Sequence, residues 1–215
     1  MNAPQTAPLT PLELRLRAAL AGTHLQAPRP LVMDDLPPNL RQQLPAGTLE
    51  QLRPAAVLAP VLRRGAELSL LLTVRASHLR SHSGQIAFPG GGRDAGDADA
   101  VANALREAQE EIGLPPQRVE VLGFLDDYPS ISRYRVTPVI GLIDGTPPLA
   151  IDHGEVAEVF ELPLATALDP QAYVLTHLDF QGEPVPMVEL HWQQHRIWGL
   201  TARMLWNLAQ KVTAI

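Results

Sequence analysis

Three glutamates lie within one turn of a helix that the sequence predicts, next to a single arginine. Glu107, Glu110 and Glu111 follow Arg106 in the segment REAQEEIGL, residues 106–114. Neighbouring like charges three or four residues apart each cost about a few tenths of a kcal/mol in a helix, and no lysine lies nearby to relieve them. Carboxylate oxygens are the ligands that hard cations such as Mg²⁺ or Mn²⁺ prefer. The pattern therefore favours a divalent-metal site over a solvated acidic surface.

The helix that carries these acids is predicted from about residue 99 to 112. Its apolar residues, at positions 101, 105, 108 and 112, fall on one side of a helical wheel and the glutamates fall on the other. Gly113 and the following prolines end it. The glycine-rich turn before the helix adds the backbone carbonyl of Gly91 as a further candidate metal ligand.

Short apolar runs and two more helical patterns surround this segment. A leading helix is predicted over residues 10–21, with Thr10 as its N-cap and Pro11 in its first turn. Strands are predicted at 55–62, 67–74, 119–125, 135–142, 157–162, 172–179 and 185–192, and a final helix at 200–212. Because strands and helices do not alternate regularly, we expect an α+β fold, a mixed-sheet α/β/α sandwich rather than a Rossmann sheet.

Prolines divide the chain into two parts. They recur at positions 28, 30, 37, 38, 45 and 54, which predicts an ordered wrap or linker without regular structure. We therefore expect residues 1–54 to form an N-terminal helix and a proline-rich extension packed on one domain, residues 55–215.

Composition limits the functions that the chain can have. The apolar content of 46% and charged content of 19%, without a long apolar run, predict a soluble protein with no membrane partner. The first residues do not resemble a secretion signal and the last match no common targeting address, so we expect a cytoplasmic location. The absence of cysteine leaves only oxygen or imidazole ligands for a metal. A net charge of −6 argues against a nucleic-acid partner, and an anionic small-molecule substrate would need local positive charge to bind; a homodimer is allowed.

The glycine turn and acidic helix together resemble the Nudix box, whose pattern is Gly, five residues, Glu, seven residues, then Arg-Glu-apolar-any-Glu-Glu-any-Gly-apolar. Residues 106–114 fill the second half without a gap. The first half departs from it: Gly92 keeps the spacing but places Ala98 at the first acid, whereas Asp97 pairs with Gly91 and leaves eight residues before Arg106. The resemblance implies Glu107 and Glu111 as the main metal ligands, Glu110 as a further ligand or base, and Arg106 as the residue that holds Glu107.

The segment LLTVRASHLRSHSGQIAFPGG, residues 71–91, is similar to the signature that precedes the box in coenzyme A pyrophosphatases. Its matching residues include Arg75, Arg80, Gly84 and Phe88. The segment IWGLTARML, residues 197–205, is a further resemblance to that subfamily. Together with Arg93, the four matching residues are the candidate substrate-binding positions, because coenzyme A carries a diphosphate and a separate 3′-phosphate that an acidic protein must bind through metal and arginines. Arg80 could instead form a structural ion pair.

The resemblance implies metal-dependent hydrolysis of coenzyme A, or an acylated or oxidised derivative, to 3′,5′-ADP and 4′-phosphopantetheine, with Mg²⁺ or Mn²⁺ as cofactor. The general base is open among Glu110, Glu155 and Glu158. Two alternatives remain: a hydrolase of ADP-ribose or another nucleoside diphosphate, and a non-catalytic binding module that retains the fold.

Overall fold

The computed structural model describes residues 9–25, 51–79, 83–130, 132–180 and 182–215. Its centre is a mixed sheet in the order β3-β2-β1-β7-β5, with β4 paired to β1, β6 to β7 and β8 to β2. Only β1 and β7 run parallel; the other pairs in the described residues are antiparallel. The strands are β1 (Arg53–Arg64), β2 (Glu67–Arg75), β3 (Ile86–Ala87), β4 (Gly90–Gly92), β5 (Val119–Phe124), β6 (Tyr128–Pro129), β7 (Tyr134–Asp144) and β8 (Val156–Pro163).

One edge of β1 changes partner along its length. Residues 55–57 pair with β4, and residues 61–64 pair with β2. Pro60, which has no N–H to donate, lies in the gap between these two pairings, where its presence in a central strand costs no hydrogen bond on that edge. The change of partner admits the glycine strand β4 into the sheet.

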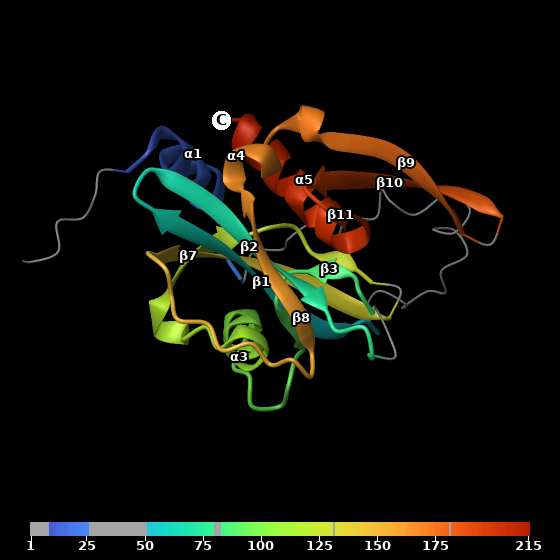
Figure 1. Ribbon diagram of the computed structural model, residues 1–215, viewed down its shortest axis with the longest axis horizontal. Helices are drawn as coiled ribbons and strands as arrows, with labels where there is room; N and C mark the ends of the chain where they lie inside the picture. The colour runs from blue at the N-terminus through green and yellow to red at the C-terminus, as the bar shows by residue number, and fades with distance from the viewer. Residues whose placement is uncertain (1–8, 26–50, 80–82, 131, 181) are drawn as a thin grey trace, which may run out of the picture.

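Helices cover both faces of the sheet, which confirms the predicted α/β/α sandwich. In Figure 1, α3 (Ala100–Ile112) lies below the sheet, while α1 (Pro11–Leu20), α4 (Leu164–Ala167) and α5 (Gly199–Thr213) lie above it. Alternate strand residues serve the two sides, as the pleat requires. Against α3 pack residues such as Leu58, Leu71 and Val139, and against the other helices pack residues such as Leu70, Leu72 and Ile140.

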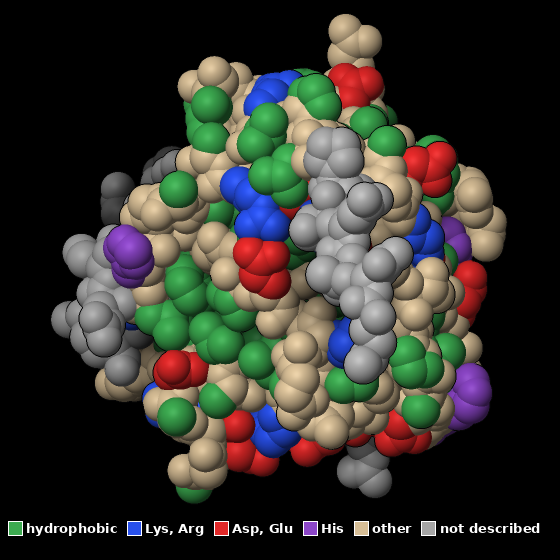
Figure 2. Space-filling view, turned by 90° about the vertical axis from the view of Figure 1, so that its left-hand side faces the viewer, with side chains coloured by type: hydrophobic (Ala, Val, Ile, Leu, Met, Phe, Trp, Pro, Cys, Tyr) green, Lys and Arg blue, Asp and Glu red, His purple; other side chains and the backbone are tan. Residues whose placement is uncertain are grey.

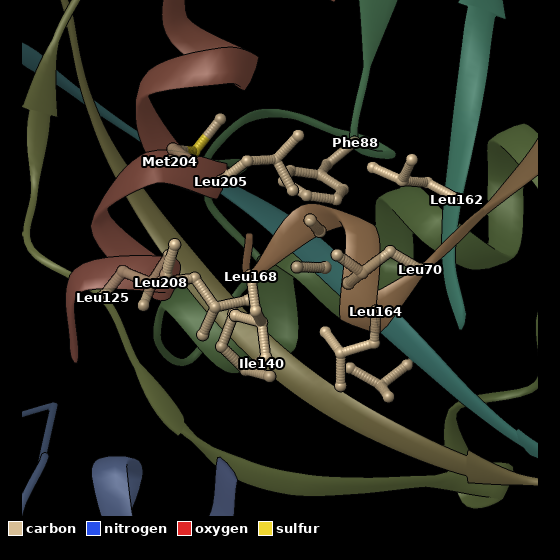
Figure 3. Packing of buried hydrophobic residues seen from close by; sticks show 14 of the residues in the cluster. Leu70, Phe88, Leu125, Ile140, Leu162, Leu164, Leu168, Met204, Leu205 and Leu208 are labelled. Atoms are coloured by element: carbon tan, nitrogen blue, oxygen red, sulfur yellow. The ribbon is translucent and has the colours of Figure 1, made fainter. Parts of the chain in front are cut away.

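The core above the sheet is built around α5. Figure 3 shows Met204, Leu205 and Leu208 of this helix against Leu70, Phe88, Ile140 and Leu162 from the sheet side and Leu164 and Leu168 around α4. A second sheet, in the order β11-β10-β9, lies beside α5. Its strands are β9 (Tyr173–Phe180), β10 (Glu183–Trp192) and β11 (His195–Ile197).

Helix α1 is an integral part of the fold. Thr10 caps it by accepting a hydrogen bond from the Glu13 N–H at 3.1 Å, and Leu16 and Leu20 are fully buried in the core above the sheet. The carboxylate of Glu13 is also fully buried, and it pairs with Arg17 at 3.0 Å and Arg63 at 3.1 Å. The end of the molecule that carries α1 faces the viewer in Figure 2, where acidic and basic side chains lie next to one another. The proline-rich residues 26–50 lie outside the described residues.

None of the helices in the described part of the chain is long and apolar enough to cross a membrane.

Candidate metal and phosphate site

Helix α3 is anchored so that its acidic face meets the glycine strand. Asp99 caps the N-terminus by accepting from the Ala102 N–H at 2.9 Å, and Gly113 ends the helix in the left-handed region at φ 67°. Ala108 and Ile112 are fully buried against the sheet. Glu107 and Glu111, each one residue earlier, lie on the adjoining face of the helix and reach toward β4.

Arg106 holds the acidic turn together. Its Nη2 donates to Glu107 Oε1 at 2.8 Å and to the Gly92 carbonyl at 3.2 Å, and its Nη1 donates to Glu110 Oε2 at 2.7 Å. Its Nε and Nη2 also donate to the two carboxylate oxygens of Asp97, both at 3.1 Å. One guanidinium therefore fixes Glu107 against the glycine strand and the loop before the helix.

Asp97 is the acid of the first half of the box that meets Arg106. Asp97 is 7% exposed, and its Oδ2 also accepts a hydrogen bond from the Asp94 N–H at 2.8 Å. The Arg106 guanidinium, more than any other group, lowers the pKa of the Asp97 carboxyl below its usual value. Asp99, by contrast, serves the helix cap, and Ala98 offers no acid.

Gly91 leaves the space that the Glu107 carboxylate occupies. A Cβ at this position would lie 2.6 Å from Glu107 Oε1, which no real side chain could tolerate without displacing it. Burial raises the pKa of Glu107, although its hydrogen bond to Arg106 acts in the opposite direction. A side chain at position 91 would therefore displace the Glu107 carboxylate from its place against β4.

Glu111 is the most deeply buried acid of the site. It is 4% exposed, and burial raises the pKa of its carboxyl to about 7. Its Oε2 accepts from the Gly90 N–H at 3.3 Å, and its Oε1 lies 3.6 Å from Arg75 Nη1. The charges of Glu107 and Glu155 raise the same pKa further. A neighbouring cation would therefore stabilise the ionised form of this carboxylate.

The predicted convergence of all three box glutamates is not what the structure shows. The Glu110 side chain is 59% exposed, and its carboxylate is paired with Arg106. Among the described residues, no three His, Asp or Glu side chains are grouped so that they could hold one metal ion. Glu107 and Glu111 remain as a pair. Mg²⁺ is commonly bound by one or two carboxylates, with waters and substrate phosphates completing its shell, so this donor set fits such an ion.

The two candidate bases on the loop and strand after the box are placed differently. The charge of Glu155 raises the pKa of both Glu107 and Glu111. Its loop is fastened to the end of α3, because the Ala150 and Asp152 N–H groups donate to helix carbonyls at 3.0 and 2.9 Å. Glu158 instead lies 3.4 Å from the His195 ring. Glu155 is therefore the acid outside the box that shares the site.

The predicted substrate-binding residues are distributed over three environments. Arg75 faces Glu111 as described, and Arg93 donates to the carbonyls of Asp97 and Ala98 at 2.7 to 3.2 Å. Gly84 forms a turn at φ 69° and donates to the Arg75 carbonyl at 3.1 Å. Arg80 lies outside the described residues.

Phe88 requires a correction. Its side chain is 3% exposed and belongs to the core above the sheet, where Figure 3 shows it beside Leu205. Its apolar ring is more stable in that core than at a phosphate site, so Phe88 positions the glycine strand without lining the substrate site.

An open cleft of about 510 Å³ lies beside Glu107. Its lining comprises Arg53, Pro54, Gly92, Arg93, Asp94, Glu107 and Tyr134. The guanidinium carbon of Arg53 lies 4.2 Å from the centre of the Tyr134 ring. Neither residue was predicted as part of the site, because each stands alone at the start of its strand and the two become neighbours only through the parallel pairing of β1 and β7.

Comparison with known proteins shows the family of the chain. A model of the NUDIX domain matches residues 52–179. A protein of Salmonella paratyphi B named as an uncharacterized Nudix hydrolase, NudL, is 48% identical over 174 residues, which are 80% of this chain and 89% of that protein.

Among solved structures, the Nudix hydrolase RenU from M. smegmatis aligns with a TM-score of 0.46 at 21% identity, over 76% of this chain and 88% of its own. A C. elegans Ap4A hydrolase aligns with a TM-score of 0.45 at 18% identity, over 52% and 80%. The family model covers more than half of the 215 residues and includes the glycine strand, Arg106 and the acidic helix. The chain therefore belongs to the Nudix hydrolase family.

Proposed function

We propose that this Nudix hydrolase cleaves the diphosphate of coenzyme A, or of an acylated or oxidised derivative, to 3′,5′-ADP and 4′-phosphopantetheine. The observation that supports hydrolysis is a pair of acids, the half-buried Glu107 and the buried Glu111, held beside an open cleft by Arg106 and the Gly90 N–H. Burial raises the pKa values of both carboxyls, which means that it destabilises their ionised forms. A bound cation would offset this destabilisation.

A bound Mg²⁺ or Mn²⁺ would supply charge neutralisation for the diphosphate and acidify the attacking water. Arg106 keeps Glu107 in position for this ion, and the Gly90 N–H and Arg75 do the same for Glu111. Glu155 is the proposed general base, because it is exposed and its charge acts on both carboxylates. It would take a proton from the water as the new P–O bond forms and the anhydride P–O bond breaks.

The choice of coenzyme A rests on the segment 71–91, which the fold delivers to the site. Arg75 ends β2 beside Glu111, and Gly90 and Gly91 belong to β4, against which α3 packs. Gly84 closes the intervening turn against the Arg75 carbonyl. Three residues of the segment that resembles the coenzyme A pyrophosphatase signature, Arg75, Gly90 and Gly91, therefore border the paired carboxylates.

The test is a turnover assay with one panel of substrates: coenzyme A, dephospho-coenzyme A, ADP-ribose and a dinucleotide polyphosphate, each with Mg²⁺, Mn²⁺ or chelator. Coenzyme A should be the best substrate, with no turnover in chelator. Glu107→Gln should lower kcat by roughly a hundredfold or more, the range for losing one electrostatic stabiliser of a transition state.

Glu158→Gln is the matched control, because this glutamate faces His195 and not the paired carboxylates. A higher kcat/KM for ADP-ribose than for coenzyme A would contradict the substrate, and lack of turnover on the whole panel would favour a binding module.

A further inference from the structure

Arg53 and Tyr134 form a prearranged cationic platform in the cleft beside Glu107. They are direct cross-strand partners in the parallel pairing of β1 and β7, and the Arg53 guanidinium lies over the Tyr134 ring at 4.2 Å. Gly92 completes the platform, since a Cβ there would approach the ring edge at 3.3 Å. Cation–π stacking restricts the long arginine side chain before any ligand arrives.

A turn before β7 is shaped to hold this platform. Arg133 adopts the left-handed region at φ 61°, a conformation that residues other than glycine adopt infrequently. Its carbonyl accepts from the Arg53 N–H at 3.0 Å, and its own N–H donates to the Ser130 carbonyl at 3.0 Å. The Ser130 hydroxyl accepts from the Tyr134 N–H, also at 3.0 Å. The backbone therefore fixes both members of the stack.

The stacked guanidinium keeps its hydrogen-bonding capacity. Stacking uses a face of the group, whereas its five N–H donors point outward in its plane. No carboxylate or carbonyl of a described residue accepts a hydrogen bond from the Arg53 side chain, although most other arginines in the described residues have a carboxylate partner, including Arg17, Arg63, Arg64, Arg106, Arg135 and Arg196. In an acidic protein, such a cation in a cleft fits an anionic ligand.

The second arginine of the cleft, Arg93, is committed differently. Its Nε and Nη2 donate to backbone carbonyls of the loop that holds Asp97, so its donors are partly used while its charge remains. Asp94 is the acid that lines the cleft besides Glu107, and it is 3.9 Å from Arg106. Arg53 is thus the cleft arginine whose side-chain donors are all left unused by the described residues, whereas Arg93 keeps only part of its donors.

We propose that Arg53, stacked on Tyr134, binds a phosphomonoester of the substrate that is separate from the diphosphate at Glu107. The planar donor edge of a guanidinium matches two phosphate oxygens at once. This inference rests on the proposed coenzyme A substrate, in which that group is the 3′-phosphate. It makes Arg53 a specificity-determining residue without a part in the bond-breaking step.

Binding of two nucleotides to the full chain tests the platform without metal or turnover. Adenosine 3′,5′-bisphosphate and adenosine 5′-monophosphate are titrated calorimetrically in chelator against wild type, Arg53→Gln, Tyr134→Leu and the control Arg118→Gln. Arg118 is exposed and bonds the Asp144 carbonyl at the opposite end of β7. Wild type should prefer the bisphosphate about ten- to a hundredfold, the range for one charge-assisted contact.

Arg53→Gln should remove this preference and leave the affinity for the monophosphate within about twofold. Tyr134→Leu should reduce the preference while the thermal transition shows a folded protein, and Arg118→Gln should retain it. Equal affinities of wild type for the two nucleotides, or equal losses for both in Arg53→Gln, would overturn the inference.

Turnover separates this inference from the proposed function. If coenzyme A is hydrolysed and Arg53→Gln reduces kcat/KM equally on coenzyme A and dephospho-coenzyme A, the function stands and the platform does not. If coenzyme A is not hydrolysed while the preference for the bisphosphate depends on Arg53, the platform stands and the proposed substrate fails.

Discussion

Replacing Asp97 with asparagine would remove the charge that Arg106 contacts through two hydrogen bonds of 3.1 Å. An amide oxygen can still accept one of them, but the amide nitrogen then faces a guanidinium donor. A hydrogen bond to a charged group contributes about 1.5 to 3 kcal/mol. We expect the lower half of that range, because the Arg106 side chain is 25% exposed and keeps Glu107 and Glu110 as partners.

Asp99→Asn is the matched control for Asp97→Asn. Asp99 caps α3 through the Ala102 N–H, and asparagine is as good an N-cap as aspartate, so the control should lose only the helix-dipole contribution of about 0.3 to 1 kcal/mol. The difference between Asp97→Asn and Asp99→Asn should be larger in activity than in stability. A small displacement of Glu107 through Arg106 should reduce kcat/KM by roughly ten- to a hundredfold in Asp97→Asn, whereas Asp99→Asn should remain near wild type.

The effect of Asp97→Asn on stability should depend on pH. Because Arg106 lowers the pKa of Asp97 in the folded protein, the ionised carboxylate stabilises the native state above its unfolded pKa, near 3.8. That contribution is lost as pH falls through the lower folded pKa. Urea unfolding should therefore show a clear loss of stability at pH 7 that disappears in strong acid. Equal unfolding free energies and equal kcat/KM values for the two variants would refute the role assigned to Asp97.

Two further predictions concern the paired carboxylates. Glu111→Gln should raise the melting temperature in chelator at pH 8. The pKa of Glu111 is about 7 in the folded protein and 4.5 ordinarily, so ionisation of this carboxyl destabilises the native state by up to about 3 kcal/mol above pH 7. This destabilisation declines as pH falls and is absent below about 4.5. Thermal unfolding at pH 4 and pH 8 measures this, and an equal melting temperature for variant and wild type at pH 8 would contradict it. Gly91→Ala should lower turnover by at least about tenfold, because its Cβ would meet the Glu107 carboxylate at 2.6 Å; Gly96→Ala, where a Cβ would meet nothing within 4 Å, is the control, and equal activity of the two would oppose the close packing.

The long helices and strands were predictable because their apolar patterns extend over many residues. The helix predicted at 99–112 is observed as Ala100–Ile112, and the strand predicted at 135–142 is observed as Tyr134–Asp144. The helix has an apolar periodicity that matches its buried face, and the strand is a mostly apolar run that is buried at every position from 136 to 143. The strands β3, β4, β6 and β11 were not predicted. They have two or three residues each, so tertiary pairing and not local pattern determines them.

The candidate site was predictable where chemistry is local to one segment. Arg106, Glu107 and Glu111 are close in sequence, and helical geometry brings them together. Glu110 pairs with Arg106 and is exposed, an arrangement that spacing alone does not reveal, and its role as a further ligand or base stays a prediction. Arg53 and Tyr134 were not predicted because they are 81 positions apart in the sequence (134 − 53). Only the pairing of β1 with β7 places them next to each other.

The loop that carries Glu155 is attached to the end of α3, so Glu155 and the carboxylates of this helix should move together. Ala150 and Asp152 donate to the last helix carbonyls, so fraying of the final turn would release the loop in the same event. The helix carboxylates and Glu155 would then separate cooperatively, and no independent loop motion is needed to open the site. Insertions of residues between positions 145 and 150, which surface connections often tolerate, should be tolerated here only if they preserve those two amide contacts.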